Sequence, residues 1–153
     1  MMEATSKAMA FYDKFFGYKY PFEKYDSVMC TEYNWGAMEN VGVVTFTDYY
    51  VYKNRPSESK LIRRTSTVIH ELAHMWFGNL VTMNWWDNLW LKESFATFTS
   101  WYVMYKLNNE MTEPIGDIWT AFLMRKNAMG YKADQSIGTH PLESTAKDTE
   151  EAN

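Results

Sequence analysis

The sequence has little cysteine and proline, and it lacks long apolar or basic runs. It contains one Cys and four Pro among 153 residues, and the lone Cys30 excludes a disulfide within the chain. No apolar run reaches the roughly 20 residues of a membrane span, and the beginning, MMEATSKAMAFYDKFFG, lacks the pattern of a secretory signal. The 15 basic residues are scattered apart from Arg63 and Arg64, which argues against nucleic acid as a partner.

Apolar and aromatic residues, by contrast, are abundant. Hydrophobic residues make up 46% of the chain and aromatic residues 18%, while the formal net charge is −4. This is enough material for the core of one ordinary domain. The polar stretch 143–153 follows the last apolar segment, and we predict that it forms a disordered tail.

Hydrophobic periodicity and turn residues predict four helices and two strands. Gly17 is expected to end the first helix, Asp87 or Asn88 to cap the third, and Thr112 to begin the fourth. The predicted helices span 4–16, 58–77, 89–107 and 112–129, and the predicted strands span about 25–31 and about 41–52. This order of elements is typical of an α+β fold.

The segment 58–77 has the clearest helical pattern. His70 and His74 lie about 40° apart on its helical wheel and outside its apolar arc, whereas a histidine that serves only core packing would sit inside that arc. A chance pair on a partly buried helix is the alternative interpretation. The apolar arc, about 140° wide, contains Leu61, Ile62, Thr65, Val68, Ile69, Leu72, Ala73 and Trp76.

The two histidines belong to the pattern H-E-x-x-H, which points to a metal site. Two imidazoles one helical turn apart can bind one zinc ion, which takes nitrogen ligands at about 2.0–2.1 Å. Glu71 projects to the side, where it can hold a water molecule beside the metal. A catalytic zinc site needs a third protein ligand, and Glu93 is the candidate because a carboxylate among aromatic residues is costly unless it is paired. The alternative is an exposed glutamate favoured by the helix dipole.

These motifs resemble a known family. H-E-x-x-H is followed after 18 residues by Glu93 and preceded by G-A-M-E-N at 36–40, as in the zinc aminopeptidases that include aminopeptidase N and the leukotriene hydrolases. The stretch HELAHMWFGNLVTMNWWDNLWLKESFAT is similar to the core of that family. The likeness runs from about Phe11 to about Leu107 and fades afterwards. Ala37 is the residue of the aminopeptidases, where leukotriene hydrolases carry a second glycine.

The resemblance assigns the metal chemistry to four residues. It implies that His70, His74 and Glu93 bind one zinc ion and that Glu71 is the general base. Thr97, one turn after Glu93, is either a hydrogen-bond partner of a ligand or a neutral helix position.

The resemblance assigns substrate binding to G-A-M-E-N. It implies that Glu39 anchors the free α-amino group of a peptide, that Gly36 and Ala37 offer backbone hydrogen bonds, and that Met38 lines the pocket for the first side chain. Asn40 completes the segment. An extended segment of this kind is also a suitable edge for the addition of a peptide strand.

The implied fold is α+β, like the thermolysin-like catalytic domain of zinc metallopeptidases, with a small mixed sheet and packed helices. Residues 1–142 would form an incomplete catalytic domain and 143–153 its tail. Family members are larger, so we expect a fragment whose transition-state tyrosine lies beyond Asn153. The isolated chain would then be a poor catalyst.

We therefore expect a zinc-dependent aminopeptidase with one zinc per chain, acting on peptides that have a free N-terminus. An endopeptidase of the same mechanism is one alternative, against which Glu39 argues. A truncated or degenerate zinc-binding relative with little activity is the other. The sequence fixes neither oligomeric state nor compartment; a cytoplasmic location is slightly favoured, and a membrane anchor can lie upstream.

Two further polar residues, Lys92 and His140, are not assigned to the metal site or to substrate binding. Lys92 precedes the third candidate ligand, and we interpret it as an ordinary surface lysine rather than the partner of a carboxylate. His140 precedes a proline in a loop, which is a poor place for a rigid ligand, so it is interpreted as structural.

Overall fold

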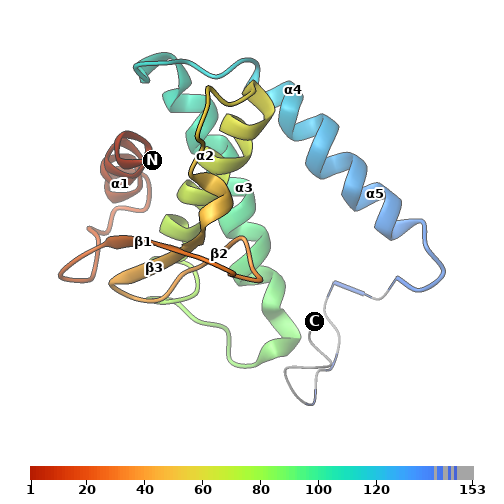
Figure 1. The fold of residues 1–153 in the computed structure, drawn as a ribbon. Helices are drawn as coiled ribbons and strands as arrows, with labels where there is room; N and C mark the ends of the chain where they lie inside the picture. Colours follow the sequence, from red (N-terminus) through yellow and green to blue (C-terminus); the bar gives the residue numbers. More distant parts are fainter. Residues whose placement is uncertain (140, 143–144, 146, 148–153) are drawn as a thin grey trace.

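The structure is a computed structural model that describes residues 1–139, 141, 142, 145 and 147. Two packed helices, α2 (Glu58–Ala73) and α3 (Leu89–Leu107), form its centre. Helix α1 (Met2–Phe15) lies on one side of them, the later helices extend on the other, and a small sheet lies at one end (Figure 1). The expected α+β composition is confirmed.

The sheet has three strands, β1 (Asp26–Cys30), β2 (Ala37–Met38) and β3 (Val43–Thr47), in the order β1-β3-β2. Strand β1 runs parallel to β3, whereas β2 runs antiparallel to it, so the sheet is mixed as predicted. The predicted strand 41–52 is too long, because its second half turns into a short 3-10 helix, η1 (Asp48–Tyr50). G-A-M-E-N contributes its own edge strand, β2.

Helix α1 forms where the sequence predicts it. Ala4, Ala8 and Tyr12 are buried, as their spacing requires, but Phe15 is half-exposed. Gly17 follows the end of the helix with a φ of 65°, the left-handed conformation that glycine adopts without strain, which confirms it as the stop.

Helix α2 buries the predicted apolar stripe almost completely, with Leu61 half-buried at its edge. It ends at Ala73 rather than at 77, because the following turn tightens. The amides of Met75 and Trp76 donate to carbonyls three residues back, at 3.1 Å each. His74 therefore stands at the C-cap of the helix, one residue beyond its last turn.

Helix α3 has the predicted bounds and follows a short 3-10 helix, η2 (Trp86–Asn88). Asn88 occupies the N-cap position, but its side chain accepts a hydrogen bond from the indole nitrogen of Trp90 at 3.2 Å and makes no capping bond. The apolar side of α3, including the fully buried Ala96, packs in the common core.

The fourth predicted helix begins at Ile118, not at Thr112. Both the amide and the hydroxyl of Thr112 donate to Glu3 of α1, at 2.9 Å each, so this residue ties the loop after α3 to α1 instead of capping a helix. Asp117 is the true cap, accepting from the amides of Trp119 and Thr120. Another short 3-10 helix, η3 (Asn108–Glu110), precedes this region, and the helix itself comprises α4 (Ile118–Phe122), the π-helical turn η4 (Leu123–Asn127) and α5 (Ala128–Asp134).

Among the described residues, no helix is long and apolar enough to cross a membrane. His140 and most of the predicted tail, 143–153, lie outside the described residues. The division of the chain at residue 142 stays a prediction.

Candidate metal centre

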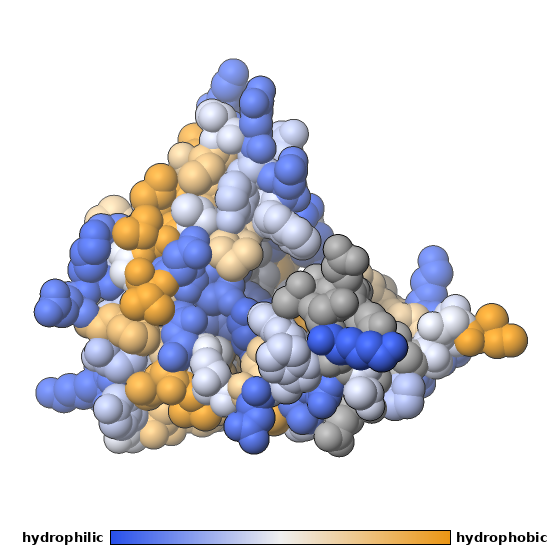
Figure 2. Space-filling model, turned by 90° about the horizontal axis from the view of Figure 1, so that it is seen from below, coloured by the Kyte–Doolittle hydropathy of each residue, from blue (hydrophilic) through white to orange (hydrophobic). Residues whose placement is uncertain are grey.

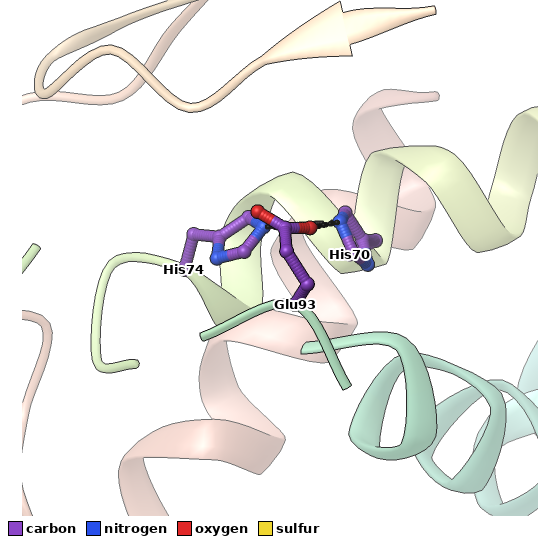
Figure 3. A group of neighbouring side chains, drawn as sticks. All are labelled: His70, His74 and Glu93. Atoms are coloured by element: carbon purple, nitrogen blue, oxygen red, sulfur yellow. Dashed lines mark hydrogen bonds and ion pairs between the residues drawn. The ribbon is translucent and has the colours of Figure 1, made fainter. Parts of the chain in front are cut away.

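The end of α2 and the beginning of α3 bring three predicted ligands together. His70 and His74 project from successive turns at the end of α2, and Glu93 reaches them from the second turn of α3 (Figure 3). The Glu93 carboxylate points between the two imidazole rings. Although 45% of the Glu93 side chain is exposed, its acidic end faces the histidines, which disfavours the interpretation as a merely solvated glutamate.

The separations of the three ligand atoms suit a tetrahedral ion. His70 Nε2 and His74 Nε2 are 3.0 Å apart, and Glu93 Oε2 lies 3.4 Å from the first and 3.6 Å from the second. Zinc bonds of about 2.0–2.1 Å in tetrahedral geometry separate neighbouring ligand atoms by about 3.3 Å. The three distances between the ligand atoms, 3.0, 3.4 and 3.6 Å, lie on both sides of this value, so the donor set fits zinc.

Further hydrogen bonds orient the two rings. The Nδ1 atom of His74 lies 3.0 Å from the carbonyl oxygen of Phe77. A proton on Nδ1 donates to this carbonyl and leaves Nε2 with its lone pair facing Glu93, the tautomer that a metal requires. Thr97 Oγ1 lies 3.4 Å from Nδ1 of His70, in keeping with a supporting role for Thr97.

His74 is more deeply placed than its position on the helical wheel suggests, with only 1% of its side chain exposed. Burial alone lowers the pKa of His74, but the hydrogen bond and charge of Glu93 outweigh it, so the pKa is raised overall. For Glu93 the directions are reversed. Burial alone raises the pKa of this carboxyl group, but its contacts with His70 and His74 hold the pKa well below its usual range. Protons and a metal ion therefore compete for the same ring nitrogens.

Glu71 lies beside the ligands without joining them. Only 5% of it is exposed, and it belongs to a second compact group in which oxygens of Glu39 and Glu71 and a nitrogen of His74 lie within 4.8 Å of one another. Burial, reinforced by the carboxylates of Glu39 and Glu93 and opposed by His74, raises the pKa of Glu71 to about 8. A carboxyl group with this pKa can both take up and release a proton near neutral pH.

The G-A-M-E-N segment runs along the opposite side of the site. Ala37 and Met38 form β2 at the edge of the sheet, and Glu39 follows directly. The side-chain amide of Asn79, just beyond α2, donates to the carbonyl of Glu39 at 2.9 Å and ties the segment to the helix end. Asn40 turns back toward β3 and donates to Thr45 at 3.4 Å, and its role in substrate binding stays a prediction.

Two pockets, called hollows below, meet at Glu71, the predicted general base. One, of about 380 Å³, contains Glu39 and all three ligands and is walled by Trp35, Trp86 and Leu89, which sequence patterns did not single out. The other, of about 260 Å³, lies toward Gly36 and Thr97. Ala37, His70 and Glu71 line both. Figure 2 views the molecule from the sheet end and shows hydrophilic side chains gathered in the middle of this face, with hydrophobic ones along one side.

Lys92 is not an ordinary surface lysine. Its ammonium group contacts Glu39 Oε1 and lies 3.5 Å from Glu93 Oε1, and only 20% of its side chain is exposed. The interpretation of Lys92 from the sequence is therefore wrong, because the helix turn that places Glu93 beside the histidines also carries Lys92 to Glu39.

Comparison with known proteins agrees with this geometry. The Peptidase family M1 domain matches residues 1–153. The chain is 38% identical to aminopeptidase N of Streptomyces lividans over 151 residues and 40% identical to the mitochondrial aminopeptidase 2 of Saccharomyces cerevisiae over 153 residues. It is 36% identical to a leucyl aminopeptidase of Saccharolobus solfataricus over 151 residues. The chain belongs to peptidase family M1.

These alignments cover 99%, 99% and 98% of the chain, so the expectation that the likeness fades after Leu107 is wrong. The chain spans only 17%, 16% and 19% of the length of these three relatives.

Proposed function

We propose that this chain is the zinc-binding part of an aminopeptidase that hydrolyses the first peptide bond of its substrates. The observation that carries the proposal is the convergence of His70, His74 and Glu93 on one point, with the buried acid Glu71 beside it. The relatives named aminopeptidases support the same reaction. The helix pair and the edge strand further support a thermolysin-like catalytic fold.

His70, His74 and Glu93 would hold the zinc ion. Bound there, zinc supplies Lewis acidity that polarises the scissile carbonyl group and acidifies a water molecule. Glu71 takes the proton from the attacking water and delivers it to the departing amine, and a cation bound beside it would favour the ionised carboxylate that this first step needs. Attack by water needs no covalent intermediate on the enzyme.

The substrate would lie along β2. Its backbone adds to the sheet edge at Ala37 and Met38, as peptide strands do at other exposed edges. Its ammonium group pairs with Glu39, which stops the peptide in the larger hollow and places the first peptide bond near Glu71. The rest of the peptide leaves through the smaller hollow. Recognition of the ammonium group is what favours an aminopeptidase over an endopeptidase.

The test separates base from ligand, in the protein expressed from its natural reading frame. Glu71→Gln keeps the shape but removes the proton acceptor, so we expect zinc to stay bound while turnover of amino-acyl anilides falls by about 10²–10⁴-fold. Glu93→Gln should instead weaken zinc binding. Glu113→Gln, an exposed glutamate between α3 and α4, is the matched control. Equal zinc loss in the Glu71 and Glu93 variants would refute the assigned roles.

Activity also tests the alternatives. N-terminally acetylated peptides should resist hydrolysis, whereas an endopeptidase would cleave them. A zinc-loaded protein without peptidase activity would identify a degenerate relative.

A further inference from the structure

Glu39, the proposed anchor of the substrate amine, already has a cationic partner within the protein, Lys92. Glu39, whose side chain is 12% exposed, contacts the ammonium group of Lys92 in a site where a substrate ammonium group is proposed to bind. Burial raises the pKa of Glu39, but Lys92, His74 and a backbone hydrogen bond together outweigh it, so the pKa is lowered overall and the carboxylate is ionised. The anchor is therefore charged and engaged before any substrate arrives.

The position of Lys92 is built into the fold. A Cβ atom on Gly78 would lie 3.0 Å from Cγ and 3.3 Å from Cδ of Lys92, so the aliphatic stem of the lysine passes directly over this glycine. Trp86 and Leu89 wall the same hollow. Held along its stem, the side chain delivers its ammonium group to Glu39, unlike a mobile surface lysine that samples many rotamers.

The charges define what Lys92 does to a ligand. A substrate ammonium group and the Lys92 ammonium group are both attracted to one carboxylate, and they repel each other when both are close to it. When a free amino terminus binds, its ammonium group replaces that of Lys92 at Glu39. This exchange contributes less binding free energy than pairing with an unoccupied carboxylate would. A ligand without an amino group does not need this exchange.

We propose that Lys92 is a specificity-determining residue that competes with the substrate's α-ammonium group for Glu39. It occupies the anchor in the free protein, is displaced from it by a free amino terminus, and thereby limits the preference for free over blocked peptides. This inference rests on the proposed function, in which Glu39 is the anchor.

A pair of hydroxamates tests it by titration calorimetry on the zinc-loaded protein from its natural reading frame. Leucine hydroxamate has an amino group, and its des-amino counterpart has the same carbon skeleton without one. The quantity of interest is the ratio of their Kd values, des-amino over amino. Lys92→Met, which keeps the apolar stem, should raise this ratio by roughly three- to tenfold by removing the competitor. Lys92→Gln should raise it too, which guards against a folding defect of one variant.

Two controls make the outcome decisive. Lys106→Met removes a charge from the same helix, over the rings of Tyr102 and Tyr105, and should leave the ratio unchanged. Glu39→Ala should bring the ratio close to one; if it does not, the anchor itself is wrong and the proposed function fails at this point. If Glu39→Ala acts as expected but both Lys92 variants leave the ratio unchanged or lower it, Lys92 does not compete and only the present inference is overturned.

Discussion

Replacing Glu71 by Gln should stabilise the metal-free protein at neutral and alkaline pH. Burial is the main reason that the pKa of this carboxyl group rises from an ordinary 4.5 to about 8. Between these values the folded state binds a proton that the unfolded chain has lost, so the stability contributed by Glu71 decreases as the pH rises from about 4.5 to about 8. Each tenfold difference in proton affinity is worth about 1.36 kcal/mol, which gives a loss of about 3 kcal/mol at about pH 7.

Hydrogen exchange of the α2 amides measures this effect, because it reports the opening of one helix even within a longer protein. The amide of Gln has its own burial cost, but that cost is the same at every pH. The informative quantity is therefore the change, between about pH 5 and about pH 8, in the difference between wild type and Glu71→Gln. Bound zinc should abolish this change, since a nearby cation favours the ionised carboxylate. A difference that stays constant with pH in the metal-free protein would refute the reasoning.

Three other outcomes follow from the geometry. His70→Ala and His74→Ala should each empty the zinc site in elemental analysis, and wild-type affinity should fall as the pH drops through the histidine range; full occupancy in either variant would contradict the site. Glu39→Ala should weaken binding of free-amine ligands by less than the about 1.5–3 kcal/mol of a hydrogen bond to a charged group, because Lys92 competes for the same carboxylate; an equal loss for acetylated ligands would place the anchor elsewhere. Gly78→Ala should destabilise the protein by about 1–3 kcal/mol in urea unfolding, because its φ is 128° and the new Cβ would crowd Lys92; unchanged stability would be the contrary result.

The helices that hold the ligands could be predicted because their signals are local. The apolar stripe of α2 follows from hydrophobic periodicity, and the start of α3 follows from the cap residues before it. The spacing of His70, His74 and Glu93 then suffices to propose a common site. Even so, the tight turn after Ala73 was missed, since it depends on where the chain goes next and not on the stripe itself.

Contacts between distant segments could not be predicted in this way. Thr112 has every local feature of a helix start, yet its hydrogen-bonding groups are taken by Glu3 at the other end of the chain. Lys92 and Glu39 likewise lie on different elements, and no pattern around either residue marks the other as its partner. In both cases tertiary contact overrides a sound local inference.

Because the three predicted ligands come from the end of α2 and the beginning of α3, an ion bound there would act as a clamp between the two helices. Packing of the two helices would strengthen metal binding, and metal binding would stabilise the packing of the helices by the same free energy. Ala96, fully buried one turn beyond Glu93, belongs to the packing that sets this spacing, although it contributes no atom to the site. Zinc affinity would in this sense be a property of the hydrophobic core as much as of the side chains that are predicted to bind the ion.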